Sequence, residues 1–68
     1  MKYKLKDDVL FHVVNKKAKL QFDFDLSDYY DKKSRVFTFP HGYVAWHLMA
    51  EVFSEFLVPL NLVEKIDD

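Results

Sequence analysis

The sequence predicts a small α+β domain: an antiparallel sheet of three to four strands in meander order, packed by one long C-terminal amphipathic helix, with a short terminal segment. Apolar and polar residues alternate over 1–6 and again over 18–26, as in strands with one buried face. Over residues 45–57 the apolar spacing changes to three or four, which is typical of an amphipathic helix. No linker or repeat interrupts the chain, so we expect a single domain over residues 1–68.

The first half of the chain has the composition of short strands. Residues 1–6 predict the first strand, and Asp7–Asp8 predict the tight turn that follows it. Residues 9–14 are apolar apart from His12, which predicts a central strand covered on both faces. Residues 18–26 alternate most regularly and predict an antiparallel strand with one dry and one wet face.

Polar residues separate the predicted strands. Residues 15–17 predict a turn, because Asn15 tolerates left-handed geometry and two lysines follow it. Residues 27–34 predict a polar loop. Residues 35–39 predict another short strand, which Pro40 ends because proline has no N–H for the ladder.

The predicted helix over 45–57 starts near Pro40 or Gly42, where no Ser, Thr, Asp or Asn caps it. Pro59 ends this helix, because the residue before a proline disfavours helical geometry. Residues 60–66 fit either a short second helix or a final edge strand, and we favour the helix.

The composition limits the class of protein. Half of the residues are hydrophobic and 18% are aromatic, a large apolar load for 68 residues. One small protomer leaves part of this surface uncovered, so we expect a homodimer or a partner groove. The absence of cysteine excludes a disulfide framework. The lysine-rich start and the lack of a long apolar run predict a cytoplasmic protein with no membrane partner.

No pattern in the sequence predicts an enzyme. There is no cysteine, no serine lies in a nucleophile motif, and a single glycine excludes a glycine-rich phosphate loop. The histidines, His12, His41 and His47, are not spaced to hold one metal ion. We therefore expect no catalytic residue, no metal and no cofactor.

Residues 20–31 form an acidic stretch that carries four aspartates and no Lys or Arg. On the predicted strand, Asp23 and Asp25 point outward and form an acidic face. The remainder of the stretch has no predicted structural role, and we expect it to make polar contacts with a partner. Those residues are Asp28, Tyr29, Tyr30 and Asp31.

Two aromatic residues outside this stretch are predicted to bind a partner as apolar anchors. If the helix covers the sheet face that carries Phe22 and Phe24, an alternate set that includes Phe37 has no covering layer, unless residues 60–66 fold back over it. Trp46 falls beside the polar stripe of the predicted helix, where a lone protomer leaves it partly exposed.

Together these observations predict a small non-enzymatic protein-protein interaction module, a regulator or inhibitor that acts as a homodimer. The amino-acid bias is typical of AT-rich codons and favours a phage or mobile-element origin. One alternative is a nucleic-acid-binding module that uses Lys2, Lys4 and Lys6, although a pI of about 6.3 argues against it. A second is an acidic nucleic-acid mimic that blocks a DNA-binding protein through Asp23 and Asp25.

Overall fold

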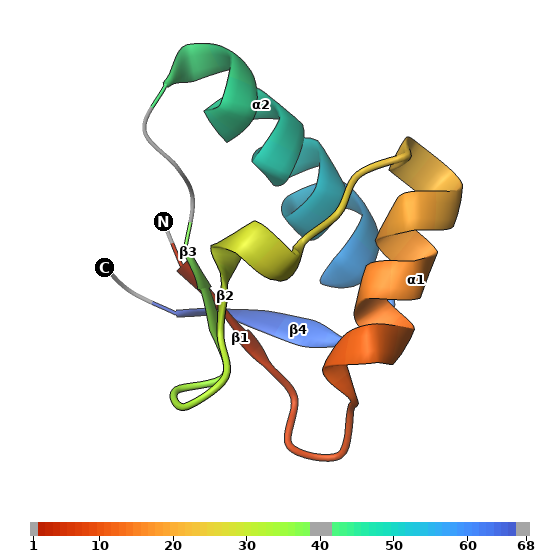
Figure 1. The fold of residues 1–68 in the computed structure, drawn as a ribbon, viewed down its shortest axis with the longest axis vertical. Helices are drawn as coiled ribbons and strands as arrows, with labels where there is room; N and C mark the ends of the chain where they lie inside the picture. Colours follow the sequence, from red (N-terminus) through yellow and green to blue (C-terminus); the bar gives the residue numbers. More distant parts are fainter. Residues whose placement is uncertain (1, 39–41, 67–68) are drawn as a thin grey trace.

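Four antiparallel strands form one sheet, and the helices pack on one face of it (Figure 1). The computed structural model describes residues 2–38 and 42–66. In chain order the elements are β1 (Lys2–Leu5), α1 (Phe11–Phe22), the 3-10 turn η1 (Ser27–Tyr29), β2 (Tyr30–Asp31), β3 (Val36–Thr38), α2 (Tyr43–Val52), the π-helical turn η2 (Phe53–Leu57) and β4 (Val63–Ile66).

The strands follow the order β2-β3-β1-β4, so β1 lies between β3 and β4. Tyr3 pairs with Phe37 of β3, and Leu5 pairs with Val63 of β4. The antiparallel α+β class is confirmed. The predicted meander is wrong, because β1 is paired with the third and fourth strands instead of the second.

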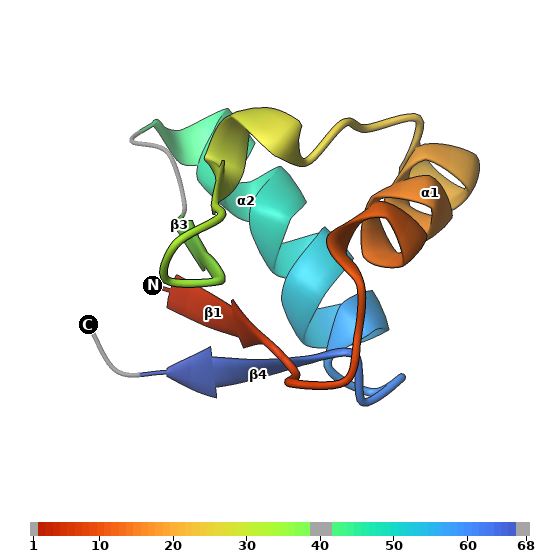
Figure 2. The same ribbon diagram turned by 60° about the horizontal axis from the view of Figure 1, so that its bottom comes forward.

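The alternation in β1 separates a covered face of the sheet from an open one. Tyr3 and Leu5 are buried under the helices, whereas Lys2 is exposed and Lys4 half-buried on the opposite face. Figure 2 shows α1 and α2 on the same side of β1 and β4. The predicted strand over 1–6 is confirmed for β1, and a turn follows at Asp7–Asp8 as expected.

The predicted strands over 9–14 and 18–26, and the turn over 15–17, are wrong, because α1 occupies most of these residues. The inward side chains recur at helical spacing: Phe11, Val14, Asn15, Ala18 and Phe22. This stripe packs on the core. Its burial favours a helix more strongly than the β-branched residues of the segment favour a strand.

The end of α1 is set by Asp23. Its backbone adopts the left-handed conformation, with φ of 55°, and its N–H donates to the Lys19 carbonyl at 2.9 Å. Aspartate tolerates this geometry better than most residues, so the helix stops here. The remaining predicted strand residues, from Phe24 to Leu26, form a connecting loop.

The predicted strand over 35–39 is confirmed for β3, which starts one residue later. Arg35 has a φ of 61° and lies outside β3, although its carbonyl still accepts the Leu5 N–H of β1 at 2.9 Å. Its guanidinium donates hydrogen bonds to the carbonyls of Lys6 and Val9, the latter at 3.0 Å, and so ties β3 to the connection before α1. Phe39 lies outside the described residues.

The predicted C-terminal helix is confirmed and consists of α2 continued by η2. The Val58 N–H donates to the Phe53 carbonyl at 2.9 Å, five residues back, which is the π-helical pattern. This wider turn buries Phe53 and Leu57, while the Ser54 hydroxyl hydrogen-bonds the Tyr3 hydroxyl. Pro59 follows the end of η2, as predicted, but the predicted reason is wrong, because Val58 keeps helical geometry with φ of -65° and ψ of -48°.

The favoured second helix over 60–66 is wrong, and the alternative of an edge strand is correct. Asn61 takes a φ of 63° and closes the turn after η2. The Lys6 N–H then donates to the Leu62 carbonyl at 3.1 Å, which aligns Val63–Ile66 against β1.

Three rings form the centre of the core. Phe53 makes edge-on contacts with Tyr3 and with Phe37, each at a centroid distance of 4.9 Å. Phe37 is fully buried because it shares the covered face of the sheet with its partner Tyr3. It therefore presents no surface to a partner protein, contrary to the prediction that it anchors an interface.

Candidate partner-binding site

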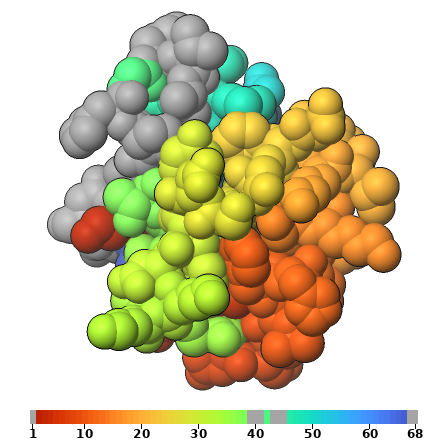
Figure 3. Space-filling model, viewed as in Figure 1, coloured from red at the N-terminus to blue at the C-terminus, as the bar shows by residue number. Residues whose placement is uncertain are grey.

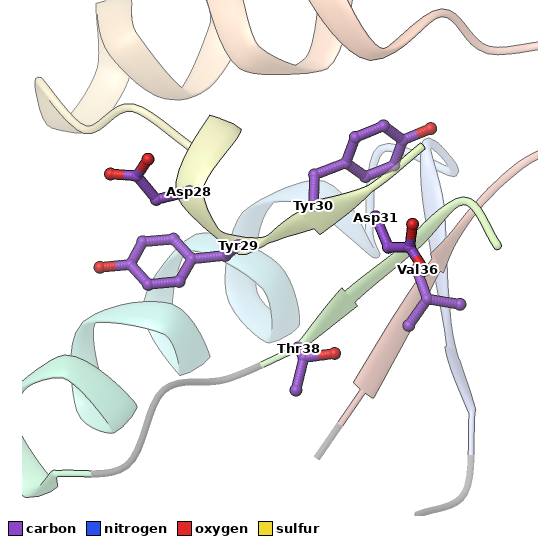
Figure 4. Close-up of a pocket in the computed structure, with 6 residues that line it drawn as sticks. All are labelled: Asp28, Tyr29, Tyr30, Asp31, Val36 and Thr38. Carbon is purple, nitrogen blue, oxygen red and sulfur yellow. The ribbon is translucent and has the colours of Figure 1, made fainter. Parts of the chain in front are cut away.

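A shallow depression lies at the β2 edge of the sheet, with a volume of about 230 Å³ (Figure 4). Its lining consists of Asp28, Tyr29, Tyr30, Asp31, Val36 and Thr38. The first four are the loop residues for which the sequence predicts partner contacts, and the fold adds two side chains from β3. In the space-filling view this segment lies at the surface beside α1 (Figure 3).

Local backbone structure positions these residues. Leu26 is fully buried, and its carbonyl accepts the Tyr29 N–H at 3.0 Å, which closes η1. The chain then extends, and Tyr30 pairs with Phe37 of β3. The predicted loop over 27–34 is thus a 3-10 turn, a two-residue edge strand and a tight turn.

The two tyrosines differ in their packing. The Tyr30 ring stacks on Phe11 of α1 with centroids 4.4 Å apart, and it lies 4.8 Å from Phe37. The Tyr29 ring stacks on Phe24 at 5.7 Å. Figure 4 shows the two side chains pointing in opposite directions, with Asp28 on the side of Tyr29. Tyr30 therefore attaches β2 to the core, while Tyr29 is held at the surface.

The two aspartates of the depression also differ. Asp31 accepts hydrogen bonds from the Lys33 N–H at 3.1 Å and from the Ser34 hydroxyl at 2.9 Å, so it stabilises the turn into β3. Within residues 2–38 and 42–66, no hydrogen bond or ion pair engages the exposed carboxylate of Asp28. Asp28 is consequently the acidic group of the depression that is available to a ligand.

The predicted acidic face of Asp23 and Asp25 does not form, because neither residue lies on a strand. Asp25 holds the connecting loop instead. Its Oδ1 accepts hydrogen bonds from the Ser27 hydroxyl at 2.6 Å, the Ser27 N–H at 2.9 Å and the Asn15 side-chain amide at 3.1 Å. The Asn15 Oδ1 in turn accepts the buried Leu26 N–H at 2.7 Å.

This hydrogen-bonding lowers the pKa of Asp25 well below its ordinary value. The Ser27 hydroxyl contributes most, followed by the Ser27 and Asn15 amides, and Lys19 adds a smaller effect from 3.7 Å. Burial acts weakly in the opposite direction. The carboxylate is thus ionised and occupied by its own chain.

Trp46 lies on α2 with 42% of its surface exposed and does not line the depression. On the same helix His47 and Glu51 approach to 3.5 Å across one turn, the arrangement of a helix-surface ion pair. The predicted contact residues therefore lie in three places: the depression, the surface of α2 and, for Phe37, the core.

The sequence reasoning missed one surface, the outward side of α1. Leu10, Val13 and Leu20 are exposed there, although they read as strand residues when the local composition is considered alone. Their spacing of three and seven residues is the signal that would have found them.

The described ranges hold neither a cluster of metal-ligating side chains nor a membrane-spanning helix. Among residues 2–38 and 42–66 no three His, Asp or Glu side chains are close enough to hold a metal ion. His41 lies outside these ranges. None of the described helices is long and apolar enough to cross a bilayer.

Comparisons of the chain with protein-family models, with curated proteins and with solved structures gave no match, so no relative supplies a function for it.

Proposed function

We propose that this protein is a small non-enzymatic module that binds another protein, and that the depression beside β2 receives a cationic side chain of that partner. The observation that carries the proposal is the unengaged carboxylate of Asp28 beside the Tyr29 ring, which Phe24 holds in place. A lysine or arginine there gains both an ion pair and a contact with the electron-rich face of the ring.

Preorganisation supports this assignment. Tyr29 and Tyr30 are both stacked on rings of the same chain, so binding freezes few additional rotamers. The gain remains modest, because exposed cation–π contacts contribute about 0.5–1 kcal/mol and exposed ion pairs about as much. The partner therefore needs a second contact outside the depression.

The test is capture of a partner from source-cell lysate, followed by affinity measurement with the purified partner. Asp28→Asn and Tyr29→Ala should each weaken binding about threefold to tenfold, because each removes one of the two attractions. Tyr29→Phe keeps the ring and should bind like the unmodified chain. Asp8→Asn, an exposed carboxylate on another turn, is the matched control. Equal losses for Asp28→Asn and Asp8→Asn would mean that only overall charge matters.

We further propose that the protein acts as a regulator or inhibitor and forms a homodimer that includes Trp46. Sedimentation should then show a dimer that Trp46→Ala weakens, whereas Leu60→Ala, which removes a comparably exposed apolar side chain, should not. A monomer at high concentration would remove the homodimer from the proposal and leave partner binding to be judged separately.

Nucleic-acid binding through Lys2, Lys4 and Lys6 has weaker support. Lys2 and Lys4 belong to the open face of the sheet, but Glu64 of β4 lies directly across from Lys4. A carboxylate beside the lysine opposes a phosphate there. Acidic mimicry also loses its basis, since Asp25 is engaged within its own loop.

A further inference from the structure

The outward side of α1 carries an apolar patch that has no role in holding the helix. Leu10 is 59% exposed, Val13 38% and Leu20 79%, while the opposite side of the helix packs on the core. Single exposed aliphatic residues are ordinary, but Val13 and Leu20 lie two helical turns apart on the outward side of α1, and Leu10 is exposed at the position just before the helix.

Val13 and Leu20 line a hollow on the surface of α1. A space of about 430 Å³ is lined by His12, Val13, Lys16, Lys17 and Leu20, which we call the α1 hollow. Four of them stand at positions i, i+3, i+4 and i+7, the diamond that receives a protruding side chain when two helices pack. The two ends of the diamond, Val13 and Leu20, are aliphatic, and the two sides, Lys16 and Lys17, are cationic.

The charged residues of α1 are all positive. Residues 9–22 contain three lysines and no carboxylate. Lys19 reaches Asp25 at 3.7 Å, whereas Lys16 and Lys17 are exposed beside the hollow. Lysines near the end of a helix also suit its dipole, but that effect fades beyond the last turn and does not account for the exposed aliphatic residues, Val13 and Leu20.

Three other occupants fit this surface less well. A second copy of α1 packed antiparallel would bring Lys16 and Lys17 against the same lysines of the copy, which repel one another. A nucleic acid needs a longer basic surface, and Asp7, Asp8 and Asp23 bracket α1 at its two ends. A lipid surface offers no protruding side chain to fill a concave space.

We propose that the α1 hollow is a docking site for an acidic amphipathic helix of a partner protein. An aliphatic side chain of that helix enters the diamond between Val13 and Leu20, and carboxylates beside it meet Lys16 and Lys17. This site is separate from the depression beside β2 and needs neither Asp28 nor Tyr29, so the two proposals stand or fall independently.

The experiment measures binding of a fluorescein-labelled peptide of leucine and glutamate, with the leucines at helical spacing, by fluorescence anisotropy. Leu20→Ala should weaken binding at least about tenfold, because it removes one end of the diamond. The double change Lys16→Glu with Lys17→Glu should abolish binding of this peptide and create binding of the counterpart in which lysine replaces glutamate. Asp28→Asn should bind the peptide like the unmodified chain.

The matched control is Lys32→Glu with Lys33→Glu on the β2–β3 turn, which changes the net charge by the same amount on exposed residues away from α1. An equal loss of binding in this control, or no effect of Leu20→Ala, would overturn the proposal. So would tighter α1-dependent binding of phosphatidylglycerol vesicles or of duplex DNA than of the acidic peptide. Circular dichroism checks that each variant keeps its helices.

Discussion

The two helices are attached to the sheet by different means. Among the side chains that the structure describes, the α2–η2 segment contributes four fully buried apolar ones, Met49, Val52, Phe53 and Leu57. The helix α1 fully buries only Val14 and Ala18 on its apolar side, and it adds a buried amide, Asn15, whose hydrogen bonds hold the following loop. A helix fixed partly by hydrogen bonds can be loosened by changes that leave the apolar core intact, so α1 should open before the rest of the domain.

The largest loss of stability should come from a change in the apolar contacts that hold α2 and η2 on the sheet. Phe53→Ala removes the ring that contacts both Tyr3 and Phe37 and should cost about 3–5 kcal/mol of unfolding free energy. Small domains have about 5–15 kcal/mol in total, so urea denaturation should show a domain close to unfolding. Glu55→Ala, an exposed neighbour, should stay within about 0.5 kcal/mol. A small loss for Phe53→Ala would contradict the central place of this ring.

Loss of the hydrogen bonds that Asn15 makes should reduce stability less, and mainly around α1. Asn15→Ala leaves the buried Leu26 N–H without its acceptor and should cost about 1–3 kcal/mol. Amide exchange should accelerate at Leu26 and along α1 more than along α2. The control Gln21→Ala changes an exposed amide on the same helix. Uniform acceleration in both helices would show that they open together and would remove the distinction between them.

The smallest effect should appear in the pH dependence of stability. Because the pKa of Asp25 is lowered in the folded state, the folded protein binds fewer protons, and its contribution to stability is fully present above the ordinary carboxyl pKa of about 3.9. The contribution is lost as the pH falls further towards the folded-state pKa. Denaturation midpoints should therefore drop more below pH 4 for the unmodified chain than for Asp25→Asn. Parallel curves would assign the acid sensitivity to other carboxylates.

The parts of the fold that the sequence predicts are those with one dominant pattern. Residues 1–6 alternate without competition, and 45–57 repeat every three or four residues, so β1 and α2 are recognisable. In α1 two patterns overlap: Leu20 continues the alternation with Phe22, yet it is 79% exposed in the structure. The inward stripe of α1 also includes Asn15, a polar residue that hides the helical period from a hydrophobic pattern.

The sequence points to the loop that lines the depression but not to the different roles of its carboxylates. The acidic stretch supplies four of the six residues that line the depression. Its carboxylates look alike in sequence, yet Asp25 and Asp31 hold turns of their own chain while Asp28 does not. These roles depend on hydrogen bonds to the Asn15 amide and to Ser34, whose geometry follows only from the folded loop.

The pairing of β1 with β4 bears on circular permutation of the chain. Lys2 is paired with Ile66, so two positions at opposite extremes of the described residues face each other across one ladder. Paired residues of adjacent antiparallel strands lie about 5 Å apart, which a few glycines can bridge. A circular permutant joined there and reopened at the exposed Lys32–Lys33 turn would keep every strand beside its present neighbours. If this permutant folds, formation of the sheet requires the same pairs of neighbouring strands but not the same order of connections between them.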